Sequence, residues 1–197
     1  MDNNKLQIKD LVNIGIFSAL YMVITMIAMI PAGFSPIIWI LWPALAGLLG
    51  GAFFTLLMAK VQKPGTALLL IFIVGLIYFA IGECTWTIVA TCAAAGILAE
   101  VPRKLLGYNT FSGMLVAGGL CAMGLVGSPL PMWLFKESYM KSIIEMGMGE
   151  DYVASMKTMI STGSLLGMLL AAFIGGAAGV CIGRLLLKKH FEKAGII

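Results

Sequence analysis

The sequence contains 197 residues, of which 60% are hydrophobic and 11% are charged, and its formal net charge is +4. An ordinary soluble domain has about 25% charged residues, and it needs them to cover its surface. The composition therefore excludes a soluble globular enzyme, a nucleic-acid-binding domain and a disordered tail. It indicates an all-α polytopic membrane protein, with room for about six helices of some 20 apolar residues each.

Apolar stretches separated by polar or proline-containing turns predict six membrane-spanning helices in a single domain. We interpret the first stretch as a retained span and not as a cleaved signal peptide, because residues 1–10 lack a small-residue cleavage site. The apolar run 66–99 is too long for one ordinary helix, and Gly82-Glu83 is its natural break. The predicted spans cover about residues 11–30, 37–58, 66–81, 84–100, 110–127 and 160–187.

The fifth loop, residues 130–158, is the most polar segment outside the tails. Within it, apolar residues alternate with acidic ones over 138–158, which predicts a short amphipathic helix on the membrane surface. Such a helix is placed to act as a lid over a pocket.

The positions of the basic residues predict the orientation of the chain. Basic residues lie in the N-terminal tail, in the second and fourth loops and at the C-terminal end, whereas the short first and third loops have none. By the positive-inside rule, both termini are cytoplasmic and the odd loops face outward. The basic residues at the cytoplasmic boundaries are Lys5, Lys9, Lys60, Lys63, Arg103, Lys104, Arg184, Lys188, Lys189 and Lys193.

Two spans carry small residues at a spacing of four, which lets membrane helices approach closely. In span six these are Gly175, Gly179 and Gly183, and packing within the chain is the favoured interpretation. In span one they are Gly15 and Ala19, for which internal packing and docking of another membrane subunit are equally open.

The outward loops collect aromatic and polar residues that are suited to a small-ligand site. Glu83 stands out because a carboxylate at membrane depth is costly and usually faces a cavity or a partner. The alternatives are an aromatic belt for the tryptophans and a solvated loop for Glu83. The candidate binding residues are Trp39, Trp42, Tyr78, Glu83, Trp86, Ser128, Trp133 and Lys136.

Catalytic and metal-binding motifs are absent from the sequence. The single histidine, His190, lies in a basic tail, and no HExxH, GxSxG or P-loop pattern is present. The four cysteines show no CxxC spacing, and the methionines of the fifth loop are irregularly spaced. We expect no enzyme activity, no metal and no cofactor. An ion-driven carrier usually keeps ionisable groups at mid-membrane, and none is predicted there, so we expect a binding subunit that relies on an energised partner.

Three segments resemble the S component of energy-coupling factor (ECF) vitamin transporters, in the subfamily labelled MptD or Trep_Strep. They are the opening 9–21, the fifth-loop segment 129–139 and the closing 183–195, so the resemblance covers nearly the whole chain. It implies a six-helix bundle in the bacterial plasma membrane that captures a vitamin-like molecule at its outer face.

The resemblance also implies partners, namely a transmembrane T component and two cytoplasmic ATPases. In the family, a small-residue motif on the first helix meets the T component, and Gly15 and Ala19 match that motif. Ligand contacts come from loops one, three and five. The chain lacks the N-terminal histidine of the nickel and cobalt branch, so metal uptake is set aside. The alternatives are an autonomous small secondary transporter or channel, and a structural or assembly protein.

Overall fold

The computed structural model describes residues 5–188, and over these residues the chain is helical, without strands. The long helices are α1 (Ile8–Met29), α2 (Pro36–Lys60), α3 (Thr66–Ala80), α4 (Trp86–Leu106), α5 (Phe111–Gly124) and α9 (Thr162–Leu186). The short helices are η1 (Ile30–Phe34), η2 (Leu125–Gly127), α6 (Pro131–Leu134), α7 (Lys136–Glu145) and α8 (Glu150–Thr158).

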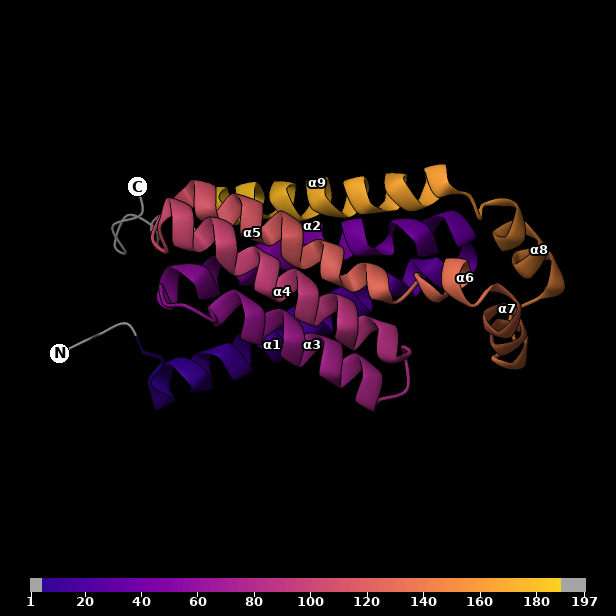
Figure 1. Cartoon of the computed structure of the whole chain (residues 1–197), viewed down its shortest axis with the longest axis horizontal. Coiled ribbons are helices and arrows are strands. Elements are labelled where there is room, and N and C mark those ends of the chain that lie inside the picture. The colour runs from indigo at the N-terminus through magenta and orange to yellow at the C-terminus, as the bar shows by residue number, and fades with distance from the viewer. Residues whose placement is uncertain (1–4, 189–197) are drawn as a thin grey trace.

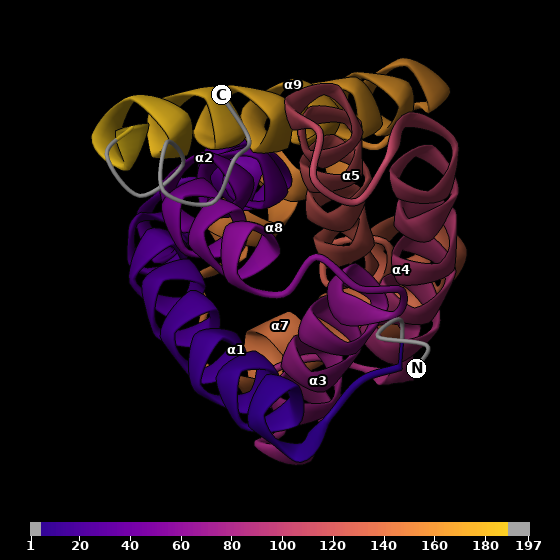
Figure 2. The same ribbon diagram turned by 90° about the vertical axis from the view of Figure 1, so that its left-hand side faces the viewer.

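The long helices run along the long axis of the molecule in alternating directions (Figure 1). The start of α1 and the end of α9 therefore lie at the same end of the bundle, and α6, α7 and α8 lie at the other. Seen from the first end, the helices form a ring in the order α1, α2, α9, α5, α4 and α3, in which neighbours are in contact (Figure 2).

The all-helical prediction is confirmed, and three segments are long and apolar enough to cross a membrane: Ile8–Phe34, Pro36–Lys60 and Thr162–Leu186. The segments Thr66–Ala80 and Phe111–Gly127 are apolar but shorter. The helix ends agree with the predicted ranges to within a few residues, except that α4 continues past the predicted end at 100 to Leu106. Six membrane crossings and cytoplasmic termini stay predictions.

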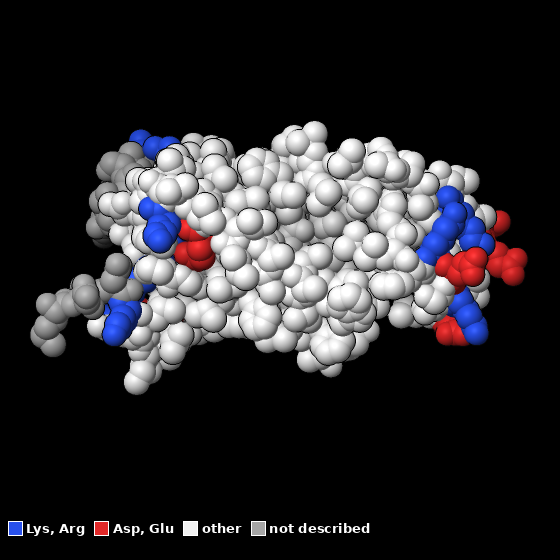
Figure 3. Space-filling model, viewed as in Figure 1, with Lys and Arg blue, Asp and Glu red and all other residues white. Residues whose placement is uncertain are grey.

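Charged residues gather at the two ends of the bundle, and the face between them is free of charge (Figure 3). The 25-residue α2 is about 37 Å long at 1.5 Å per residue. This length exceeds the roughly 30 Å hydrocarbon core of a bilayer. The distribution is the one that a bilayer requires, with charges at headgroup level and apolar side chains between them.

The small residues of α9 pack inside the chain, against α2. A Cβ atom on Gly179 would lie 2.7 Å from the carbonyl oxygen of Leu48, and one on Gly183 would lie 2.7 Å from Thr55 Oγ1. Gly175 approaches the backbone of Ala44 in the same way. The two backbones can therefore meet along most of their length only because these three positions have no side chain.

The single amphipathic helix predicted over 138–158 is wrong, because the structure divides this segment into α7 and α8. The break lies at Gly147, whose φ is +91°, a conformation that glycine adopts readily and other residues avoid. The division turns the fifth loop into two helices that lie at different angles across the end of the bundle (Figure 1).

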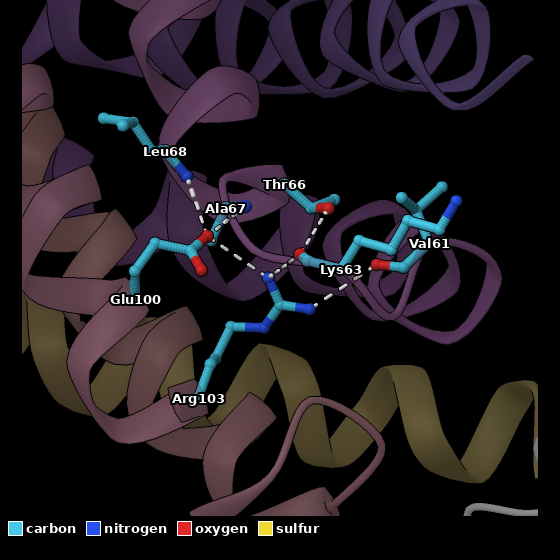
Figure 4. A network of polar contacts seen from close by, with 7 residues as sticks. All are labelled: Val61, Lys63, Thr66, Ala67, Leu68, Glu100 and Arg103. Atoms are coloured by element: carbon cyan, nitrogen blue, oxygen red, sulfur yellow. Dashed lines mark hydrogen bonds and ion pairs between the residues drawn. The ribbon is translucent and has the colours of Figure 1, made fainter. Parts of the chain in front are cut away.

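A polar network holds the helices together at the end where α1 starts (Figure 4). Arg103 is only 1% exposed, and its guanidinium donates to Glu100 Oε1 at 3.2 Å and to the carbonyls of Val61 and Lys63 at 3.5 Å. Glu100 Oε1 also accepts from the backbone N–H of Ala67 at 2.8 Å, in the first turn of α3. Because Arg103 pairs with Glu100 and bonds to the 61–65 turn, while Glu100 bonds to the start of α3, the last turns of α4 are held in place beyond the residues predicted for span four.

Candidate ligand-binding cavity

A cavity of about 330 Å³ lies between the bundle and the two helices α7 and α8. This volume falls at the lower end of the roughly 300–1,000 Å³ typical of small-molecule sites. The walls come from all three loops that were predicted to face outward. The lining residues are Ala32, Gly33, Trp39, Gly82, Glu83, Cys84, Thr85, Ser128, Pro131, Phe135, Ser138, Tyr139, Ser142, Ile143, Met146, Met148, Tyr152 and Met156.

One face of α7 and one face of α8 supply half of this lining. The residues from α7 and its flanks repeat at helical spacing, as do those from α8, so each helix turns one side to the cavity. The same periodicity is present in the sequence, but it does not by itself mark these residues as site residues. The positions are Phe135, Ser138, Tyr139, Ser142, Ile143 and Met146 in α7 and its flanks, and Met148, Tyr152 and Met156 in α8 and the link before it.

The short helices α6, α7 and α8 form a cap over this end of the bundle. Hydrogen bonds and a separate hydrophobic cluster hold the cap in place. The Tyr152 hydroxyl donates to the carbonyl of Ala32 in η1 at 2.8 Å, and the Trp133 indole donates to the carbonyl of Ser161 at 2.9 Å. The cluster joins the start of α2, η2 and α9 to the cap. Its buried members are Ile40, Val126, Met132, Met140, Val153, Met156, Met168 and Ala172.

The turn between α3 and α4 forms another wall and is tied to the end of η2. Cys84 Sγ donates to Ser128 Oγ at 3.1 Å, and Thr87 Oγ1 donates to the carbonyl of Gly127 at 2.7 Å. Gly82 has a φ of +78°, which lets the chain reverse tightly before Glu83. The turn therefore presents residues 82–85 to the cavity from a fixed position.

Of the predicted site residues, the structure brings Trp39, Glu83 and Ser128 to the cavity wall. Trp42 and Tyr78 lie behind that wall and are fully buried. Trp42 stacks on Trp39 with ring centroids 6.2 Å apart and meets Tyr78 edge-on at 5.7 Å. The Trp42 indole donates to the carbonyl of Thr25 at 3.0 Å, and Thr25 Oγ1 shares a hydrogen bond of 2.9 Å with the Tyr78 hydroxyl.

The other three predicted residues lie outside the lining. Trp86 is 58% exposed and packs beside Phe135, with ring centroids 6.4 Å apart. Trp133 fastens α6 to the start of α9, and Lys136 is exposed at the start of α7. These positions suit residues that support the cap or meet the membrane interface.

The cavity is apolar and aromatic with a few polar groups. Burial raises the pKa of the Tyr139 and Tyr152 hydroxyls, so both phenols are neutral and able to donate or accept a hydrogen bond. The indole N–H of Trp39 is buried beside the Tyr139 hydroxyl and makes no hydrogen bond of good geometry among the described residues. A bound molecule with an acceptor group is one way to satisfy this donor.

The predicted docking residues of α1 lie on the outer surface of the bundle. A Cβ atom on Gly15 would have nothing within 4 Å outside its own helix, and Ala19 is exposed. Apolar side chains surround them, including Ile16 and Val23, which are more than half exposed. Within the described residues, no helix of this chain covers the Gly15 and Ala19 pair.

Metal ligation is a poor match to the described part of the chain, where no three His, Cys, Asp or Glu side chains come together. His190, the only histidine, lies outside the described residues. The cavity polar groups are hydroxyls, an indole, a thiol and one carboxylate, a set that suits an organic molecule better than a metal ion.

The bundle, its apolar middle and the capped cavity define a helical integral membrane protein with a cavity at one end. The chain belongs to the family described as hypothetical bacterial integral membrane protein (Trep_Strep), whose model matches residues 8–193. Comparisons with curated proteins and with solved structures gave no match.

Proposed function

We propose that this protein is the substrate-binding S subunit of an ECF-type importer in the bacterial plasma membrane. In this proposal it captures a vitamin-like molecule at the outer face and delivers it inward with a T component and two cytoplasmic ATPases. The observation that carries the proposal is the cavity of about 330 Å³ beneath α7 and α8.

The construction of the cavity supports binding over a purely structural role. Trp39 is stacked on Trp42, which is itself held by a hydrogen bond to Thr25. A binding wall of this kind is rigid before a ligand arrives, so little conformational entropy is lost on binding. A structural or assembly protein has no need of a preformed aromatic pocket.

Two further observations support dependence on a partner. The pair Gly15 and Ala19 offers a smooth, uncovered patch on α1 that suits close approach of another membrane helix. The sequence has no P-loop with which to hydrolyse ATP.

Within the six long helices, every Asp, Glu, Lys and Arg lies within about two turns of a helix end, which argues against the alternative of an autonomous secondary transporter. Such carriers usually keep ionisable residues near the membrane centre.

The cavity assignment predicts that a bulky side chain on the lining face of α7 abolishes binding. Ser142 lines the cavity, and Ser142→Trp fills part of its volume. Ser155 on α8 is exposed and lies outside the lining, so Ser155→Trp is the matched control. Each protein is purified from bacterial cells in mild detergent, and the released small molecules are compared by mass spectrometry.

We expect at least one compound to be enriched in the wild type and in Ser155→Trp, and at least tenfold depleted in Ser142→Trp. The size of the loss follows from steric exclusion of the compound from the pocket. Equal amounts of every compound in all three proteins would contradict the proposal.

A further inference from the structure

We propose that the cavity selects an organic cation with an aromatic or heteroaromatic ring. This inference rests on the proposed function, because it names the class of molecule that the same cavity takes. Its starting point is the charge of the lining, which contains the carboxylate of Glu83 and no Lys, Arg or His among the described residues.

Glu83 is an exposed residue of the cavity wall, and its carboxylate is free to meet a ligand that enters the cavity. No salt bridge or side-chain hydrogen bond between described residues involves it, whereas Glu100 and Asp10 at the opposite end both have partners within 3.2 Å. Glu83 follows Gly82 in the tight α3–α4 turn and lies next to Cys84 and Thr85, which also line the cavity. An anionic ligand would meet this charge without a compensating cation, which costs affinity.

The aromatic residues of the lining favour the same class of molecule. Trp39, Tyr139, Tyr152 and Phe135 come from separate elements and surround one space. The faces of such rings attract a cation within about 6 Å, most strongly at Trp and where water is excluded. They also stack on a flat ring, so a cationic heterocycle gains both interactions at once.

Methionine side chains contribute the apolar part of the wall. Met146, Met148 and Met156 belong to α8 and to the link between α7 and α8. Thioethers are polarisable and adapt to irregular shapes, so they suit the apolar body of a ligand and leave the choice of charge to Glu83.

The test uses yeast extract divided by ion exchange into cationic, uncharged and anionic fractions. Each fraction is added to the purified protein, and thermal unfolding is followed to measure the shift in Tm. Four proteins are compared: the wild type, Glu83→Gln, Glu137→Gln and Ser142→Trp. Glu137 is exposed on α7 and lies outside the lining, so Glu137→Gln makes the same charge change away from the cavity.

We expect the cationic fraction to raise the Tm of the wild type and of Glu137→Gln. In Glu83→Gln, the concentration of this fraction that gives half of the maximal Tm shift should be at least tenfold higher. Ser142→Trp should show no shift. A larger shift from the uncharged or anionic fraction, or an unchanged response of Glu83→Gln, would overturn the inference and leave the proposed function standing. No shift from any fraction, in a protein that also retains no small molecule on purification, would contradict both.

Discussion

In α9, Gly175, Gly179 and Gly183 lie against the backbone of α2, whereas in α1 Gly15 and Ala19 lie on the outer surface of the bundle. Both helices place small residues four apart, so the sequence pattern is the same. The small residues of α9 are buried against α2 in the folded chain, whereas those of α1 are exposed and available to another molecule. Spacing alone therefore says that a close approach is possible, and the neighbouring helices decide whether the approach is internal.

The largest effect on stability is expected from a bulky side chain among the buried glycines of α9. Gly179→Leu places a side chain where a Cβ atom alone would lie 2.7 Å from the Leu48 carbonyl oxygen. Because backbone atoms of α2 cannot yield as a flexible side chain can, we expect the free energy of unfolding to fall by about 3 kcal/mol or more. Thermal unfolding in detergent measures the change.

Gly167→Leu is the matched control for this prediction, since Gly167 also lies in α9 but a Cβ atom there would have nothing within 4 Å outside its own helix. Its stability should equal or slightly exceed that of the wild type, because leucine favours the helix over glycine by up to about 1 kcal/mol. A similar loss in both variants would show that the contact between α9 and α2 is not the cause.

A substitution among the exposed small residues of α1 is expected to change transport but not the stability of the protein. Gly15→Leu adds bulk to the uncovered face of α1, so the chain should fold as before and retain the co-purifying compound. Uptake by cells that also produce a T component and its two ATPases should fall at least tenfold, because a close helix contact depends on small residues. Gly167→Leu again serves as the control and should leave uptake unchanged.

Unchanged uptake in Gly15→Leu would remove the docking role from this face. A large loss of stability would show instead that the small residues of α1 are covered in the folded protein. Either outcome would contradict the view that α9 uses its small residues for internal packing and α1 uses its own for docking a partner.

A smaller effect is expected from the contacts that hold α1 by its first turn. Asp10 Oδ2 accepts from the backbone N–H of Gln7 at 2.8 Å and from Lys63 Nζ at 2.6 Å. Asp10→Asn keeps the shape but loses the ion pair, so we expect a loss of about 1 kcal/mol in stability. Asn13→Asp, one turn further along, should change the Tm by much less, since Asn13 bonds only to its own helix, at Lys9. Equal effects of the two substitutions would contradict a specific role for the Asp10–Lys63 pair.

The six long helices could be predicted from the sequence because apolar run lengths and Pro- or Gly-containing turns determine them locally. The end of α4 could not, because the partners that bury Arg103 are carbonyls of residues 61 and 63, far away in the sequence. The division of the fifth loop could not be predicted either. Apolar residues continue through 138–158, and Gly147 interrupts them by a backbone conformation and not by a change of polarity.

The site could be predicted by region but not by residue. Trp39 and Trp42 are three residues apart on α2 and look equivalent in sequence, yet only Trp39 reaches the cavity. The cavity residues of α7 and α8 could not be identified because their spacing also fits the apolar face of a surface helix. A helix face that packs on lipid and one that lines a pocket have the same periodicity.

In the proposed function, this chain binds a small molecule and does not transport it alone. Purified protein is reconstituted in liposomes, and accumulation of the compound that co-purifies with it is measured under an imposed proton or sodium gradient. We expect binding that is lost in Ser142→Trp, and no accumulation above the equilibrium level in liposomes that contain this chain alone. Gradient-driven accumulation by the chain alone would contradict it.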